Sequence, residues 1–188
     1  MLYAAPLSHG AGLYAIPHLM AGARHVVPES GGVDPEELFA LGRHHGPLTT
    51  FAAPTIVRRL VEQALAEGLD PDHAARCFKT IVYGGAPMYA ADIRRALEVM
   101  GPRFVQIYGQ GESLMTITAL SRGALADVQH PRWAERIASV GVAQTPVQVR
   151  VADAQGLPLP PGELGEVLVK GDTVMAGYWR QPEATAAA

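Results

Sequence analysis

Cysteine and lysine are both scarce in this chain of 188 residues. Cys77 is the only cysteine, which excludes an internal disulfide framework. We therefore expect a reducing, cytoplasmic environment, with Cys77 as a buried apolar residue. The only lysines are Lys79 and Lys170, and neither ends a glycine-rich segment. The sequence thus contains no phosphate-binding loop of the kind that ends in lysine.

Long apolar segments and a basic surface are missing as well. Residues 2–23 carry no Asp, Glu, Lys or Arg, yet Pro6, Pro17 and several glycines and histidines interrupt them. Because no basic segment precedes this stretch either, it predicts neither a signal peptide nor a membrane span. The formal net charge of -3 offers nucleic acid no basic surface. We expect small-molecule partners, with no nucleic acid and no membrane span.

The first part of the chain alternates short apolar segments with helical ones, which predicts parallel strands joined by crossover helices. Asp34 and Pro35 are typical of a helix start, and apolar residues at helical spacing indicate two further helices. The expected fold class is α/β, a doubly wound parallel sheet layer. The predicted helices cover about residues 34–44, 54–68 and 90–101, and the predicted strands cover residues 25–27, 48–52, 80–83 and 104–108.

The second part of the chain has a different pattern. After Ser121 a polar and irregular stretch runs to Ser139, and segments typical of strands follow at residues 147–151 and 166–169. The prolines between these two segments cannot donate to a strand ladder, so they mark a turn or short loop. We expect a small β unit here.

Residues suited to ligand binding occur at the ends of the predicted strands. In open α/β sheets ligands bind outside the carboxyl ends of the strands, where Pro54, Gly84 and Glu112 are expected. The adjacent Gly84 and Gly85 would let a planar ligand lie on the backbone, or they form only a tight turn. Tyr108 offers an aromatic face for stacking, or it packs on the sheet. Glu112 offers a carboxylate oxygen to a hard cation such as Mg2+, so these segments predict half of a nucleotide site.

Four motifs follow one another along the chain. They are residues 6–12 (PLSHGAG), residues 83–87 (YGGAP), residues 108–112 (YGQGE), and residues 161–166 (PGELGE) followed by 177–179 (GYW) and 182–185 (PEAT). Their order resembles the adenylate-forming, or AMP-binding, superfamily, which includes acyl-CoA and aryl-CoA synthetases, luciferases and adenylation domains of peptide synthetases. The resemblance implies a parallel α/β subdomain of the AMP-binding domain at residues 1–120 and part of a small β-barrel at residues 121–188.

The resemblance also implies roles for particular residues. In the family, the aromatic residue of the third motif stacks on adenine and the glutamate helps to hold Mg2+, while the histidine of the first motif lies beside the acyl pocket. Gly109 is a further candidate wall of that pocket. The implied catalytic residues are Glu112 and His9, the cofactor-binding residues are Gly84, Gly85, Ala86, Pro87, Tyr108, Gly109, Gln110 and Gly111, and the substrate-pocket residues are Gly10 and Tyr14.

Gly111 departs from the family pattern. It stands where the family has a threonine whose hydroxyl approaches the α-phosphate, so that donor is lost. A backbone N–H, Gln110 or Ser113 serves instead, or the phosphate is held less firmly. Gly111 itself is a candidate only through its backbone.

The activity implied by the resemblance is an ATP-dependent carboxylate–CoA ligase that uses ATP, Mg2+ and coenzyme A. A carboxylic acid first becomes an acyl adenylate, and a thiol then takes the acyl group. The phosphate loop, a ribose-binding aspartate and the small domain with the catalytic lysine are not found. We therefore expect a fragment of the large N-terminal domain that is inactive alone and self-associates through exposed apolar surface.

Other classes of function compete with the ligase. A non-catalytic nucleotide-binding or structural module is the main alternative for the chain as it stands. A serine hydrolase is disfavoured because no Gly-x-Ser-x-Gly segment occurs. His44 and His45 are neighbours at a helix end and do not converge on one face, so no zinc site is expected.

Overall fold

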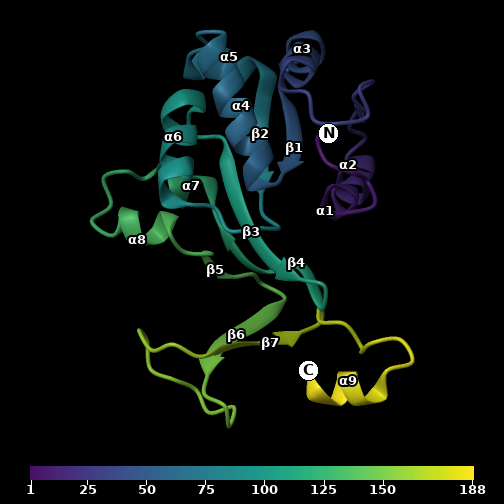
Figure 1. The fold of residues 1–188 in the computed structure, drawn as a ribbon, viewed down its shortest axis with the longest axis vertical. Helices are drawn as coiled ribbons and strands as arrows, with labels where there is room; N and C mark the ends of the chain where they lie inside the picture. The colour runs from purple at the N-terminus through teal and green to yellow at the C-terminus, as the bar shows by residue number, and fades with distance from the viewer. The chain divides into compact units, whose positions relative to one another are not determined.

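The computed structural model describes all residues, Met1–Ala188, and the chain forms two compact units (Figure 1). The first unit comprises Met1–Ile107 and Leu120–Gly141, and the second comprises Tyr108–Ala119 and Val142–Ala188. The predicted boundary at residue 120 separates subdomains of a family, which are defined differently from these compact units. The boundary therefore stays a prediction. None of the helices combines the length and the apolar character that crossing a bilayer requires.

A parallel sheet forms the centre of the first unit. Strand β1 (Leu48–Ala52) pairs with β2 (Phe78–Tyr83), and β2 pairs with the first part of β3 (Phe104–Gln110), both in parallel. The register places Ala52 beside Tyr83 and Tyr83 beside Gln106. The three strands predicted at residues 48–52, 80–83 and 104–108 are thereby confirmed. The strand predicted at residues 25–27 is wrong, because only a single bridge joins Val26 to Leu2 there.

The crossover helices of the first unit begin and end at local signals in the sequence. Asp34 accepts a hydrogen bond from the backbone N–H of Glu36 at 3.1 Å and caps α3. Gly46 and Gly101 follow α3 and α6 with φ of 84° and 75°, values that favour glycine. The three predicted helices are confirmed as α3 (Pro35–His45), α4 (Pro54–Ala66) and α6 (Ala90–Met100). A fourth, α5 (Pro71–Cys77), was not predicted.

The sheet differs from the predicted doubly wound arrangement. Its strands lie in chain order, β1-β2-β3-β4-β5, so the order never reverses as it does in a doubly wound sheet. Helices α4 and α6 pack against each other, as expected when successive right-handed crossovers lie on one face (Figure 1). The sheet is also mixed, because β4 (Ser113–Leu120) pairs antiparallel with β5 (Val142–Ala143).

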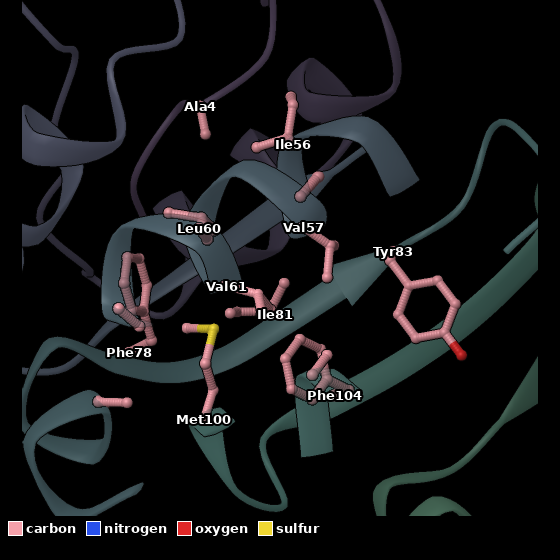
Figure 2. Close-up of a cluster of buried hydrophobic side chains, with 14 of the residues drawn as sticks. Ala4, Ile56, Val57, Leu60, Val61, Phe78, Ile81, Tyr83, Met100 and Phe104 are labelled. Atoms are coloured by element: carbon pink, nitrogen blue, oxygen red, sulfur yellow. The ribbon is translucent and has the colours of Figure 1, made fainter. Parts of the chain in front are cut away.

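The core of the first unit lies between these helices and the sheet (Figure 2). Leu60 of α4, Ile81 of β2 and Phe104 of β3 are completely buried in it. Cys77 is buried as predicted, and burial raises the pKa of its thiol. Arg103 is also buried and donates to the carbonyl oxygens of Met100, Phe78 and Pro71, the last two at 2.9 and 2.8 Å. This arginine therefore joins α5, β2 and α6 through backbone acceptors.

Short helices occupy two regions of the first unit for which none was predicted. The stretch predicted to be irregular contains α7 (Arg122–Ala126) and α8 (Trp133–Ile137), and Ser121 caps α7 by accepting from Ala124 N at 3.2 Å. Near the amino end lie α1 (Gly10–Leu13) and α2 (Ala15–Met20). Each has at most 6 residues, too few for a periodic apolar pattern to indicate a helix.

The second unit contains little regular structure besides the end of β3, β4 and β5. Strands β6 (Val147–Ala152) and β7 (Glu166–Gly171) form a two-stranded antiparallel sheet, and α9 (Pro182–Ala187) follows. Both strands were predicted, and the structure shows a small two-stranded sheet with no barrel. A closed barrel requires a ladder of more strands than these two.

Candidate functional site

The turn after β2 lies at the carboxyl edge of the parallel sheet in the first unit. The N–H of Gly84 donates to the carbonyl of Ala52 at 3.4 Å, so the ends of β1 and β2 meet there. A Cβ added to Gly84 would lie 2.6 Å from both Cδ1 and O of Ile107, whereas Gly85 has space around it and a φ of 81°. Glycine is therefore required at both positions, for close packing at the first and for backbone conformation at the second.

This requirement is satisfied without any ligand, so the tight-turn interpretation accounts for both glycines. The backbone from Gly85 to Pro87 is nevertheless exposed before α6 begins. Exposed backbone next to a sheet edge is a surface on which a planar ring can lie. Contact between adenine and Gly84, Gly85, Ala86 and Pro87 stays a prediction.

Tyr14 lies at the same sheet edge as Gly84. Its ring stacks on Phe51 of β1, with ring centroids 5.6 Å apart and an interplanar angle of 21°, and Phe51 immediately precedes Ala52. Burial raises the pKa of Tyr14 to about 12, so its hydroxyl stays protonated at neutral pH. The structure thus brings Tyr14 to the sheet edge that also carries the turn from Gly84 to Pro87.

His9 and Gly10, the predicted site residues of the first motif, lie at the start of α1 and are not fully buried. His9 is exposed at the start of α1, where its Nδ1 is hydrogen bonded to the neighbouring Ser8 hydroxyl at 3.0 Å. Gly10 is the first residue of α1 and is half-buried. The catalytic role predicted for His9 and the pocket role predicted for Gly10 stay predictions.

In the second unit, Tyr108 lies in β3 and Glu112 lies in the turn between β3 and β4. A Cβ added to Gly109 would overlap the backbone N of Met115 and lie 2.8 Å from the carbonyl oxygen of Ser113. Gly109 is therefore required for the close approach of the two strands. This packing alone explains a glycine here, without the predicted role as a wall of the acyl pocket. Gly111 faces open space, and its backbone remains the only part of it that could serve a ligand.

The two side chains considered as replacements for the missing threonine both have partners. Gln110 Nε2 donates to the Tyr108 hydroxyl at 3.0 Å and thus supports the ring predicted to stack on adenine. Ser113 Oγ is 2.9 Å from Thr116 Oγ1, which donates to Thr173 Oγ1 at 2.8 Å. Ser113 is buried, whereas Gln110 is exposed. Exposure makes Gln110 the more accessible of the two donors.

A cavity of about 360 Å³ in the second unit is lined by most residues of the third motif. Its volume lies in the range of ordinary small-molecule sites. Glu166 and Met175 line it from β7 and the segment after β7, and sequence reasoning had assigned neither of them a role. The predicted site residues in its lining are Tyr108, Gln110 and Glu112, with Ser113 beside them.

Glu112 has two partners in the segment that follows β7. The Tyr178 hydroxyl donates to Oε1 of Glu112, and the backbone N–H of Met175 donates to the Glu112 carbonyl at 2.8 Å. The hydrogen bond from Tyr178 lowers the pKa of the Glu112 carboxyl, because it stabilises the ionised form. The same bond raises the pKa of Tyr178. Sequence reasoning placed Tyr178 in a motif without giving it a role.

The carboxylates in this cavity fit one kind of Mg2+ site. No group of three or more His, Cys, Asp or Glu residues could hold a metal ion by itself. Glu112 and Glu166, however, line the same cavity. Mg2+ is usually bound through one or two carboxylates together with substrate phosphates and waters. The residues therefore fit an ion that arrives with a nucleotide and do not fit a site built from protein ligands alone.

The family of the chain follows from comparison with known proteins. The profile described as "AMP-binding enzyme" matches residues 1–179. The chain belongs to the AMP-binding enzyme family. This membership confirms the resemblance inferred from the four motifs.

Similar proteins include a CoA synthase and an amide bond synthetase. Feruloyl-CoA synthase of Amycolatopsis sp is 34% identical over 98% of this chain and 35% of its own length. The amide bond synthetase McbA of Marinactinospora thermotolerans is 33% identical with a TM-score of 0.83, over 100% of this chain and 35% of that one. ATP-bound MatB of Rhodopseudomonas palustris is 27% identical with a TM-score of 0.76, over 99% of this chain and 34% of that one. The chain thus spans about a third of the proteins that it matches.

Proposed function

We propose that this chain forms the nucleotide-binding part of an ATP-dependent carboxylate–CoA ligase. The observation that carries this proposal is the meeting of an aromatic ring, Tyr108, and a carboxylate, Glu112, in one cavity of the second unit. An adenylate needs a stacking surface for its base and a partner for the cation on its phosphates. Membership of the AMP-binding enzyme family and the similarity to ATP-bound MatB support the same nucleotide.

The reaction has two steps in this proposal. A carboxylate oxygen of the acid attacks the α-phosphorus of ATP, and the bond to the leaving pyrophosphate breaks. The thiol of coenzyme A, having lost its proton, then attacks the acyl carbon, and AMP leaves with the electrons of the acyl–oxygen bond. No protein nucleophile takes part, so the chain contributes through positioning and electrostatic stabilisation.

Each group of residues has a distinct role in that positioning. Tyr108, supported by Gln110, stacks on adenine in this proposal. Residues 84–87 of the first unit, of which 85–87 are exposed, keep their predicted cofactor-binding role. Glu112 is the ligand for Mg2+, and Glu166 in the same cavity is a second candidate. When bound, Mg2+ neutralises charge on the phosphates. With Gly111 in place of the family's threonine, we propose the exposed Gln110 side chain as the replacement donor.

The acid is proposed to be aromatic or otherwise bulky. Tyr14 and Phe51 form an aromatic stack at the sheet edge where Gly84 takes no side-chain volume. His9 and Gly10 are the further candidates of this unit for the acyl pocket. Similarity to feruloyl-CoA synthase, whose name includes an aromatic acyl group, supports this class. A preference for acetate over bulky acids in a panel of carboxylic acids would contradict it.

A second candidate function changes only the acceptor. The similarity to the amide bond synthetase McbA favours transfer of the acyl group to an amine in place of a thiol. The first step and the residues of the nucleotide site would be unchanged. Adenylation of one acid, followed by separate addition of coenzyme A and of an amine, distinguishes the two acceptors by the product formed.

Calorimetric titration of this chain with a non-hydrolysable acyl-adenylate analogue tests the nucleotide site. We expect Tyr108→Ala to weaken binding about tenfold, because stacking of a base on an aromatic ring is lost. Tyr89→Ala is the matched control, since Tyr89 is an exposed tyrosine outside all four motifs. Equal affinities for the two variants would overturn the role of Tyr108. Absence of binding by the unsubstituted chain would favour the alternative of a structural module.

Ligase activity is proposed to need more than the residues of this chain. The sequence offers no lysine-ended glycine-rich loop to hold the β- and γ-phosphates. We therefore expect negligible exchange of pyrophosphate into ATP by this chain. Exchange above a control without protein would show that the chain is sufficient for the first step.

A further inference from the structure

The carboxylate of Glu112 is held by a residue that is distant in sequence and has no assigned role. The Tyr178 hydroxyl donates to Oε1 of Glu112 across 66 positions of the chain. Met175, three residues before Tyr178, donates its N–H to the Glu112 carbonyl at 2.8 Å. Side chain and backbone of Glu112 are thus both attached to the segment after β7.

The backbone that carries Tyr178 is itself held by α9. The Tyr178 N–H donates to Thr185 Oγ1 at 2.9 Å, and that hydroxyl donates to the Gln181 carbonyl at 2.9 Å. Gly177 has a φ of 147°, and a Cβ there would lie 2.6 Å from Thr185 Cγ2. The close contact between Gly177 and Thr185 leaves the Tyr178 backbone little freedom to move away from Glu112.

We propose that Tyr178 is a positioning residue, whose phenol fixes the Glu112 carboxylate through one oxygen and leaves the other for a divalent cation bound with nucleotide phosphates. This inference rests on the proposed function, in which Glu112 is a ligand for Mg2+. It adds a residue that touches neither the cation nor the nucleotide. Tyr178 acts through Glu112.

The chemistry of a phenol suits this role. A partly exposed glutamate has several rotamers, and binding a cation restricts them at an entropic cost. A hydrogen bond made beforehand reduces that cost. The phenol is a neutral donor, so the carboxylate keeps its negative charge, which a lysine or arginine at the same position would offset. Partners of this kind commonly change metal affinity about tenfold or more when removed.

Calorimetric titration of ATP into this chain, with Mn2+ and with EDTA, tests the proposal. The quantity compared is the gain in ATP affinity that Mn2+ gives. We expect Tyr178→Phe to reduce this gain about tenfold and to leave ATP affinity in EDTA unchanged, since the ring remains. Trp179→Phe is the control, because Trp179 is an exposed aromatic neighbour that contacts Arg180 and not Glu112.

Glu112→Gln separates failure of the inference from failure of the proposed function. We expect it to abolish most of the Mn2+ gain, and we expect Tyr178→Phe to have no further effect in that background. If Glu112→Gln removes the gain and Tyr178→Phe does not reduce it, the positioning role is overturned. Equal losses with Mn2+ and with EDTA in Tyr178→Phe would show a merely structural role and also overturn it. A gain that survives Glu112→Gln, or is absent from the unsubstituted chain, overturns the metal role of Glu112 and the inference together.

Discussion

The two units of this protein differ in what their side chains do. Buried apolar residues from α3, α4, α6 and the parallel strands fill the first unit, whereas only Ile117, Val147 and Ala152 are buried apolar residues of the second. The second unit nevertheless provides the cavity with Tyr108 and Glu112. Apolar burial therefore stabilises mainly the first unit, and hydrogen bonds and close backbone contacts shape the polar site of the second.

Truncation of one leucine in each unit tests this comparison most strongly. Leu60 is fully buried in the first unit, and Leu164 is 99% exposed in the second. We expect Leu60→Ala to lower the free energy of unfolding by about 3 kcal/mol, because it leaves a cavity in the core. Leu164→Ala should change it by less than about 0.5 kcal/mol. Urea denaturation measures both values, and similar effects of the two substitutions would remove the distinction between the units.

A pair of glycines tests whether backbone contacts rather than apolar burial shape the second unit. Gly109→Ala places a methyl group against the backbone of Met115, whereas Gly111→Ala places one in open space. We expect a loss of about 2 kcal/mol for Gly109→Ala, with weaker binding of ATP, and less than about 0.5 kcal/mol for Gly111→Ala. Denaturation and calorimetry provide the two measurements. Equal stability of the two variants would mean that β3 and β4 adapt freely.

The smallest expected effect concerns a helix cap of the first unit. Asp70 caps α5, and hydrogen bonds from the backbone N–H of His73 and from its ring lower the pKa of the Asp70 carboxyl. Because the folded pKa is below the unfolded one, this stabilisation is complete above the unfolded pKa and is lost as pH falls through the folded pKa. Thermal melting between about pH 5 and about pH 2 should show this loss.

Asp70→Asn is the matched control for that titration. Asparagine also caps helices but does not ionise, so its melting temperature should fall less steeply over the same acid range. Parallel curves for aspartate and asparagine would assign the acid sensitivity to other carboxylates. Since the cap is exposed, a modest difference in slope is the expected result.

Much of the first unit was predictable because its signals are local. Capping by Asp34, the glycine after α6 and the apolar spacing of α4 each depend on residues within a few positions of one another. Helix α5 carries the same signals, with Asp70 as the cap and Pro71 after it, and could have been found in the same way. Strand β4 was missed because the glycines of its turn were interpreted as ligand-binding residues.

The candidate site was predictable only in part for a related reason. The third motif identified Tyr108 and Glu112, which line one cavity. Tyr178 as the partner of Glu112 was not predictable, since 66 positions separate them. The order of the strands within the sheet and the lack of a barrel were not predicted either. The sequence of one strand does not reveal which other strands pair with it.

The sequence by itself determined the local elements, the single buried thiol and membership of the AMP-binding enzyme family, because each depends on residue type and short spacing. Only the tertiary structure decided which distant groups meet. Arg103 reaches carbonyls of α5 and β2, Gly84 packs on Ile107, and Tyr178 donates to Glu112. Such contacts depend on the register of paired strands and on how helices pack over them, which no local pattern specifies.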